Sequence, residues 1–314
     1  MTTVSRRRCP SRTRIGWGIA HAHHGEILQG IFTGPDGEPC QGLVTVPLRC
    51  AGSEAFFYPE ADTDGPIRVR VEPSDRVYAA QAATALITRL HHIHGLPRYH
   101  GRLVIQGRLP IGAGMGSSSS DVLAALRAVG NAMRACPCPD ELSRLAVSIE
   151  GACDPLAHLP RTVLFAQRLG EVLEDFGALL PPMTVLSCRT GGGAPVETLA
   201  CPPPTPALIP EYDRLRHTLR QAVVDGDIHT IGAVATASAE LNQERLPRPE
   251  LTQLRAIAAG HGAVGVQVAH SGSVAGLLFP GSLSIEDPQI TDSAASLEHH
   301  GIPVLGIHPL LDGG

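Results

Sequence analysis

A glycine- and serine-rich segment between a predicted strand and a predicted helix constrains this chain more than any other feature. It spans residues 112–120 of the stretch LPIGAGMGSSSSDVLAALRAVGNAM, and the apolar run RLVIQ (residues 102–106) precedes it. Apolar residues then recur every three or four positions, as on one face of a helix: Val122, Leu126, Val129 and Met133. Glycines let the backbone approach a phosphate, and the free N–H groups of a first helical turn attract anions. The pattern therefore predicts an anion-binding helix start, with Ser118 and Asp121 as its S-x-x-D capping pair.

A flexible Gly/Ser linker is the alternative interpretation of this segment. We favour the anion site, because linkers are not usually bracketed by an apolar strand and a strongly amphipathic helix. The chain also contains no lysine, so all 25 basic residues are arginine. Walker A loops, the protein-kinase strand lysine and Schiff-base chemistry each require lysine and are excluded. Any ATP would be held by backbone N–H groups, hydroxyls, arginine and metal.

The composition is that of a soluble globular protein with one large domain or two of ordinary size. The 314 residues are 43% hydrophobic and 18% charged, with a net charge of −5 and no apolar run long enough to span a membrane. The negative charge and the 4% aromatic content disfavour an RNA-binding function. Eight scattered cysteines form no CxxC pair, which predicts reduced thiols and a cytoplasmic location. Five arginines make residues 1–14 a basic, disordered arm in this interpretation.

Elsewhere the sequence predicts strands and helices in an α+β order. Strands are expected within residues 15–31, 43–48, 55–58, 67–71 and 102–106, with helices at 74–94 and from 139. A hairpin is expected over residues 161–173. In the second half we expect strands at 183–187, 264–269, 274–279 and 303–307, and helices at about 211–225, 228–242, 249–259 and 289–299. This second set suits a ferredoxin-type layer, and Pro181-Pro182 marks the candidate domain boundary.

Three stretches of the chain resemble the motifs of the GHMP kinase superfamily. PIGAGMGSSSS (residues 110–120) is similar to P-x-x-x-G-L-G-S-S-A-A, with methionine for leucine and serines for the two alanines. VAHSGSVAGLL (268–278) resembles the third motif with fewer glycines. HGEILQG (24–30) resembles the first-motif region C-G-E-L-x-Q-G of the L-threonine kinases of cobalamin synthesis, although His21-Ala22 replaces its opening Pro-Gly. Residues 161–177 and 191–198 resemble the same branch, so the similarity covers nearly the whole chain.

This resemblance implies a two-domain α+β fold. The N-terminal domain, residues 15–180, would resemble ribosomal protein S5 domain 2 and bind ATP. Residues 181–314 would form a ferredoxin-like C-terminal domain, with ATP and substrate in the cleft between the two. The implied reaction transfers the γ-phosphoryl group of ATP, with Mg²⁺, to an acceptor hydroxyl. Phosphoryl transfer asks mainly for positioning and for stabilisation of charge on the phosphate oxygens, which the helix start offers.

The resemblance also implies roles for residues of the glycine-rich loop and of the segment that follows the next helix. Ser118 would lie beside the metal and phosphates, and Glu150 would be the metal carboxylate. Asp154 lies where the L-threonine kinase branch has E-P-x-D, with spacing one residue longer, and would be a general base or a substrate contact. A turn residue before proline is an equally weighted interpretation of Asp154. The implied ATP-binding residues are Pro110, Gly112, Gly114, Met115, Gly116, Ser117, Ser118 and Ser119.

The acceptor-binding residues implied by the first and third motifs are His24, Gly25, Glu26, Gln29, His270, Ser271, Gly272 and Ser273. Glu26 would bind an ammonium group or cap its turn, and His270 would face the ligand or stabilise its own turn. A zinc cluster of His21, His23, His24 and Glu26 is the alternative for the first motif. We disfavour it, because a strand places His21 and His23 on one face and His24 on the other.

The leading hypothesis is an ATP- and Mg²⁺-dependent kinase for a hydroxylated amino acid or related metabolite, most like L-threonine kinase. A kinase for a different, non-proteinogenic acceptor is the first alternative. A nucleotide-binding regulator without catalysis is the second, although Ser118, Glu150 and Asp154 argue against it. We expect a small-molecule substrate and neither a nucleic-acid nor a membrane partner, and a homodimer is left open.

Overall fold

The computed structural model describes residues 14–60, 65–107, 115–191, 205–270 and 273–310, apart from the side chains of residues 49–51. The strands are β1 Gly16–Thr33, β2 Pro39–Glu60, β3 Val69–Glu72, β4 His100–Gly107, β5 Val163–Ala166, β6 Glu171–Asp175, β7 Met183–Arg189, β8 Gly265–Val268, β9 Val274–Pro280 and β10 Val304–Pro309. The helices are α1 Val77–His94, α2 Ser117–Met133, α3 Pro139–Glu150, α4 Ile209–Asp225, α5 Ile228–Leu241, α6 Leu251–His261 and α7 Pro288–His299. Short 3₁₀ helices lie at η1 Pro155–His158, η4 Pro206–Leu208 and η5 Asn242–Glu244.

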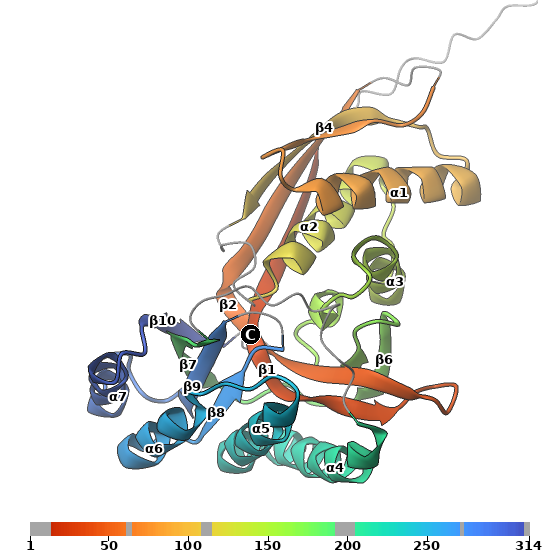
Figure 1. The fold of residues 1–314 in the computed structure, drawn as a ribbon. Coiled ribbons are helices and arrows are strands. Elements are labelled where there is room, and N and C mark those ends of the chain that lie inside the picture. The colour runs from red at the N-terminus through yellow and green to blue at the C-terminus, as the bar shows by residue number, and fades with distance from the viewer. Residues whose placement is uncertain (1–13, 61–64, 108–114, 192–204, 271–272, 311–314) are drawn as a thin grey trace, which may run out of the picture.

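The strands form one continuous sheet that runs through both halves of the chain. Its order is β10-β7-β9-β8-β1-β2-β4-β3, and β5 pairs with both β2 and β6. The long strands β1 and β2 form an antiparallel ribbon, and β1 joins the second half through Glu26, which lies opposite Val268 on β8. In Figure 1, α1 and α2 lie along the upper part of the ribbon, α4 and α5 lie beside its lower part, and α6 lies beside β8. The predicted α+β class is confirmed.

Local sequence signals account for where several helices begin and end. Gly95 ends α1 in the left-handed conformation (φ 62°), and Pro139 occupies the first turn of α3. Asp227 and Asp287 cap α5 and α7 by accepting hydrogen bonds from backbone N–H groups of the first turn. None of the helices within the described part of the chain is long and apolar enough to cross a membrane.

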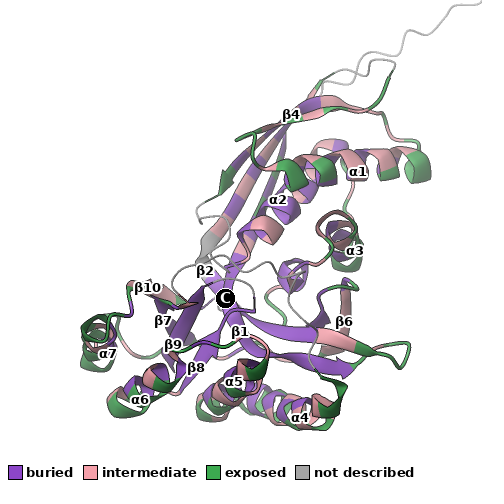
Figure 2. Ribbon diagram, viewed as in Figure 1, coloured by how far each residue is buried: buried purple, intermediate pink, exposed green. Residues whose placement is uncertain are grey.

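The hydrophobic core consists of clusters on both sides of the ribbon, seen as buried purple segments in Figure 2. One cluster packs α1 and α2 against the sheet and includes Phe57, Leu103 and Val129. A second contains Phe32 from β1 and Tyr212 from α4, so it joins the two halves of the chain. The domain boundary expected near residue 180 stays a prediction. Residues 1–13 of the basic arm lie outside the described residues.

The contact between β1 and α4 leads to a stability prediction at Gly30. A Cβ atom added there would lie 2.3 Å from the ring of Tyr212, which is buried beside Phe32. Overpacking of this kind usually costs about 1–3 kcal/mol, so Gly30→Ala should lower the free energy of unfolding by that amount in urea titrations. Gly260→Ala is the matched control, because a Cβ on this α6 residue meets nothing within 4 Å. The control should gain up to about 1 kcal/mol, and equal losses in both variants would contradict the packing argument.

Candidate functional site

The start of α2 is the first part of the site, and its geometry corrects one expectation. Gly116 caps the helix in the left-handed conformation (φ 67°), with no hydrogen bond from a capping side chain. The predicted Ser118–Asp121 cap is therefore wrong. Asp121 instead accepts a hydrogen bond from Ser53 on β2 and pairs with Arg76 at 3.3 Å, because it lies on the helix face turned toward the sheet. The backbone N–H groups at the start of α2 therefore have no capping side chain among the described residues, as an anion site requires.

Close packing explains why position 116 must be glycine. A Cβ atom there would lie 2.3 Å from Cδ2 of His23 and 3.3 Å from Oδ2 of Asp154. Met115 and Ser117 are buried beside it, and the Ser119 hydroxyl accepts a 3.4 Å hydrogen bond from the N–H of Asp154. The described part of the predicted ATP loop thus touches the predicted catalytic segment. Pro110, Gly112 and Gly114 lie outside the described residues.

Ser118 and Glu150 are brought together from α2 and α3. The Ser118 hydroxyl donates a hydrogen bond to Oε1 of Glu150, while Oε2 is buried without a hydrogen-bond partner among the described residues. Burial raises the pKa of Glu150 to about 7, with Ser118 opposing this effect and Asp154 adding to it. A hydroxyl beside a carboxylate with a free oxygen fits a hard cation such as Mg²⁺, which takes one or two carboxylates and retains water.

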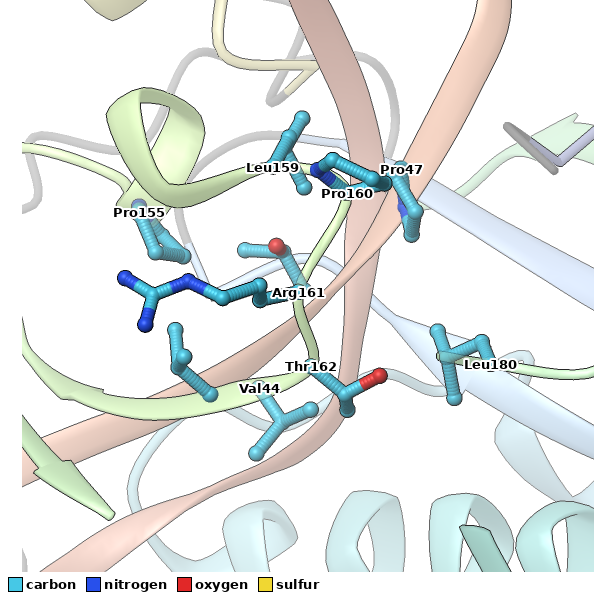
Figure 3. A pocket seen from close by; sticks show the side chains of 10 residues that line it. Val44, Pro47, Pro155, Leu159, Pro160, Arg161, Thr162 and Leu180 are labelled. Carbon is cyan, nitrogen blue, oxygen red and sulfur yellow. The ribbon is translucent and has the colours of Figure 1, made fainter. Parts of the chain in front are cut away.

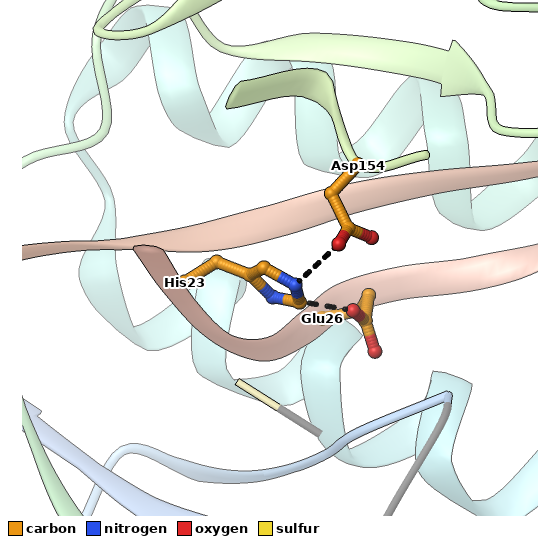
Figure 4. A group of neighbouring side chains, drawn as sticks. All are labelled: His23, Glu26 and Asp154. Carbon is orange, nitrogen blue, oxygen red and sulfur yellow. Dashed lines mark ion pairs between the residues drawn. The ribbon is translucent and has the colours of Figure 1, made fainter. Parts of the chain in front are cut away.

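Four further side chains form a cluster that we call the His–acid ring: His23, Glu26, Asp154 and His270. Nδ1 of His23 lies 3.5 Å from Oε1 of Glu26, and Nε2 lies 3.1 Å from Oδ2 of Asp154. Figure 4 shows His23 between the two carboxylates. His270 completes the ring, with Nδ1 2.8 Å from Oε1 of Glu26 and Nε2 4.0 Å from Oδ1 of Asp154. The two imidazoles stack with ring centroids 6.4 Å apart and planes 15° apart.

The charges of the ring stabilise one another. Burial alone would lower the pKa of His23, but the charge and hydrogen bond of Asp154, with Glu26, raise that pKa to about 9. Burial would raise the pKa of Asp154, but His23 outweighs it and holds that pKa well below the ordinary value. Burial again acts to lower the pKa of His270, but the charge and hydrogen bond of Glu26 outweigh burial and raise that pKa above its ordinary value. At neutral pH His23 is therefore a cation and Asp154 a carboxylate.

Other residues of the first and third motifs have structural surroundings. His24 is buried on the other side of the bend at Gly25 (φ 62°), where its Nε2 lies 2.6 Å from the Ser187 hydroxyl. The side-chain amide of Gln29 donates to the carbonyl of Val268, so it fastens β1 to β8. Roles for these residues in acceptor binding stay predictions.

The third motif is described only in part. Ser273 is buried, and its carbonyl accepts a hydrogen bond from the N–H of Thr190. Ser271 and Gly272 lie outside the described residues. The motif therefore contributes His270 to the ring and, through Ser273, a backbone hydrogen bond to the residue that follows β7.

In the part of the chain that the structure describes, only two members of the alternative zinc cluster in the first motif, His23 and Glu26, are brought together. Among the described residues, ligand atoms of His23, Glu26 and Asp154 lie within 4.8 Å of one another. Both ring nitrogens of His23 already face carboxylates, as expected for a protonated imidazole in two ion pairs. His24 lies outside this group, in contact with Ser187.

Sequence reasoning missed His23 as a partner of Asp154. The two residues are 131 positions apart, and no motif links them. Register shifts in the β1–β2 pairing on both sides of His23 and Glu26 let neighbouring residues turn toward the same ring. The signal available was a histidine near a glycine that adopts positive φ, which indicates an irregular strand.

A small pocket is lined in part by residues that follow Asp154 in the sequence, as Figure 3 shows. Pro155, Arg161 and Thr162 line it together with Val44 and Pro47 of β2. None of the predicted site residues is part of its lining. This pocket is therefore separate from the His–acid ring and the start of α2.

Comparison with known proteins agrees with this geometry. Residues 77–158 match the family model described as GHMP kinases N terminal domain, a range that contains Ser118, Glu150 and Asp154. L-threonine kinase of Salmonella typhimurium is 26% identical over 271 residues, which cover 81% of this chain and 80% of that protein. Residues 77–158 therefore belong to the N-terminal domain family of the GHMP kinase superfamily. The resemblance of the chain's three motifs to this superfamily is thereby confirmed.

Two further comparisons concern relatives and solved structures of similar fold. The chain is 30% identical over 190 residues to 4-diphosphocytidyl-2-C-methyl-D-erythritol kinase of Caulobacter vibrioides, covering 57% of this chain and 58% of the relative's length. Homoserine kinase from Cytophaga hutchinsonii superposes with a TM-score of 0.67 over 97% of this chain and 96% of that chain, at 14% identity. The second similarity shows the fold alone and confirms the GHMP kinase architecture.

Proposed function

We propose that this protein transfers the γ-phosphoryl group of ATP, with Mg²⁺, to a hydroxyl of an amino acid or related metabolite, with L-threonine as the first candidate acceptor. The observation that carries the proposal is that two pairs of side chains lie beside the start of α2. Ser118 and Glu150 form one group at the start of α2, and Asp154 with His23 forms the other beside Gly116. A nucleotide phosphate and an acceptor hydroxyl would meet between them, at the junction of residues 15–180 and 181–314.

The start of α2 supplies the phosphate side of this site. Its first-turn N–H groups and the positive end of the helix, equivalent to roughly half a charge, favour phosphate oxygens. Ser118 and Glu150 would hold Mg²⁺, which when bound neutralises charge on the transferring group. Ser118 orients Glu150 through their hydrogen bond and leaves Oε2 of the carboxylate without a hydrogen-bond partner among the described residues.

Asp154 supplies the acceptor side of the site. Its lowered pKa makes it a weak proton acceptor in the free enzyme, so its first task is to orient the acceptor hydroxyl. This agrees with phosphoryl transfer through a loose transition state, in which little proton transfer is needed before the new P–O bond forms. The proton would pass to Asp154 late, once the attacking oxygen has become acidic.

L-threonine is the first candidate because a relative named L-threonine kinase matches 81% of this chain. At 26% identity the acceptor is not carried over with the name, so a non-proteinogenic hydroxy amino acid is the alternative. A regulator without catalysis would have no need for a partly buried Ser118–Glu150 pair near an ionised Asp154.

A coupled ADP-release assay over hydroxy amino acids tests the proposal. L-threonine, L-serine and L-homoserine are compared with L-valine, which matches threonine in shape but lacks the hydroxyl. We expect threonine or another hydroxy amino acid to stimulate ADP release and valine to give only the background rate. If ATP binds but no hydroxylated acceptor raises turnover, the regulator is the better interpretation.

A further inference from the structure

The four contacts of the His–acid ring differ in length, and the one between His270 and Asp154 is the longest. His23 spans the two carboxylates at 3.5 and 3.1 Å, and His270 lies 2.8 Å from Glu26. Between Nε2 of His270 and Oδ1 of Asp154 the separation is 4.0 Å, too long for a hydrogen bond. These two side chains are also the ones in the ring that reach the surface, with 8% and 9% exposure against 1% for His23 and 0% for Glu26.

We propose that the acceptor hydroxyl binds between these two side chains, held by Nε2 of His270 and Oδ1 of Asp154, and that Glu26 is a positioning residue for His270. An oxygen placed beside the 4.0 Å line can reach both atoms at about 2.8 Å, an ordinary hydrogen-bond length. The hydroxyl would donate to Asp154 and accept from His270. A hydroxyl oxygen can do both at once, whereas an ammonium group has no lone pair to accept the second bond.

The contacts of Glu26 support a positioning role. Its Oε2 accepts a 2.6 Å hydrogen bond from the backbone N–H of His270, and its Oε1 faces the ring nitrogens of both histidines. Both oxygens are therefore engaged, and the side chain is fully buried. An acceptor's ammonium group would find no free oxygen on Glu26, so Glu26 is left to position His270.

This inference rests on the proposed kinase function and assigns a catalytic role to His270. The hydroxyl oxygen forms a bond to the γ-phosphorus of ATP, and the bond between that phosphorus and the β-γ bridging oxygen breaks to release ADP. The hydroxyl proton passes to Oδ1 of Asp154 and then to solvent. An N–H group of His270 directed at the attacking oxygen makes the hydroxyl more acidic and favours loss of this proton.

His270 can donate from Nε2 while Nδ1 faces Glu26 only when its imidazole is protonated. The charged groups that face it are Glu26 and His23 on β1 and Asp154 before η1. Glu26 and Asp154 favour the protonated imidazole, and His23 opposes it. The rate should therefore fall on the alkaline side as His270 loses its proton.

Two substitutions at position 270 distinguish the roles of the two ring nitrogens of His270. The amide nitrogen of glutamine reaches the position of Nε2, and that of asparagine reaches only the position of Nδ1. We expect His270→Asn to lower kcat by about 100-fold and His270→Gln to retain at least ten times more activity than His270→Asn, with the KM for ATP unchanged in both. Thermal shifts with ATP check that each variant folds. Equal kcat values in two folded variants would overturn the proposal.

Glu26→Gln supplies an independent readout that applies even if the variants at position 270 fail to fold. Loss of the carboxylate charge should move the alkaline limb of the kcat/KM profile to lower pH by about one unit. If the alkaline limb of the kcat/KM profile in Glu26→Gln stays at the wild-type pH, Glu26 does not act through His270. If wild-type protein uses no alcohol at all, the proposed function fails and this inference with it. If wild-type protein turns over while the limb and the variant kcat values stay unchanged, only the inference fails.

Discussion

Glu150→Gln and Ser118→Ala should each lower kcat by about two to three orders of magnitude, a range typical for the loss of one preorganised charge-stabilising group. Ser118 donates to Glu150, whose second oxygen is buried and has no hydrogen-bond partner in the described part of the chain. Glutamine keeps the size of the side chain but removes the charge that a cation needs. Alanine removes the hydroxyl that orients the carboxylate. We therefore expect both variants to need more Mg²⁺ for half-maximal turnover, measured in the coupled ADP-release assay.

Matched controls for these variants are available on exposed surfaces near the site. Ser148→Ala removes an exposed hydroxyl of α3 that bonds only to the carbonyl of Leu145. Glu171→Gln removes a partly exposed carboxylate on β6 that pairs with Arg144 at 3.4 Å. Both controls should keep wild-type turnover and wild-type Mg²⁺ dependence. Wild-type turnover in Glu150→Gln and Ser118→Ala would show that the start of α2 is not the metal side of the site.

Much of the fold follows from local pattern. Apolar periodicity predicted α1, α2 and the second-half helices, and Gly95 and Pro139 marked two of their ends. These signals operate within a few residues of chain, where backbone conformation and side-chain pattern decide the outcome. The pairing of Ser118 with Glu150 came from resemblance to a family, and the structure brings the two side chains into contact.

Long-range contacts could not be derived in the same way. The capping pattern at Ser118 and Asp121 failed because tertiary contacts with Ser53 and Arg76 compete for the carboxylate. His23 was considered only as a metal ligand, since nothing in the sequence relates it to Asp154. Its position depends on an irregular β1–β2 register, which a regular alternation of strand faces does not predict.

His23→Gln should make protein stability less dependent on pH. In the wild-type protein, His23 lies fully buried between Glu26 and Asp154, which raise its pKa to about 9 against burial. A shift from about 6.5 to about 9 corresponds to about 3 kcal/mol. Because the folded-state pKa lies above the unfolded value, this contribution is complete below about pH 6.5 and is lost as pH rises through about 9.

Urea unfolding at several pH values tests this expectation. The wild-type free energy of unfolding should decline between pH 6.5 and 9, and the decline should be much smaller in His23→Gln. Near pH 6 the variant should be about 3 kcal/mol less stable than wild type, because two buried carboxylates lose their shared cation. This difference in the free energy of unfolding should become smaller toward pH 9. His94→Gln, at the exposed end of α1, should leave the wild-type profile unchanged. Parallel profiles for wild type and His23→Gln would mean that His23 is neutral in the folded protein, and Asp154 would then lack the cation that keeps it ionised.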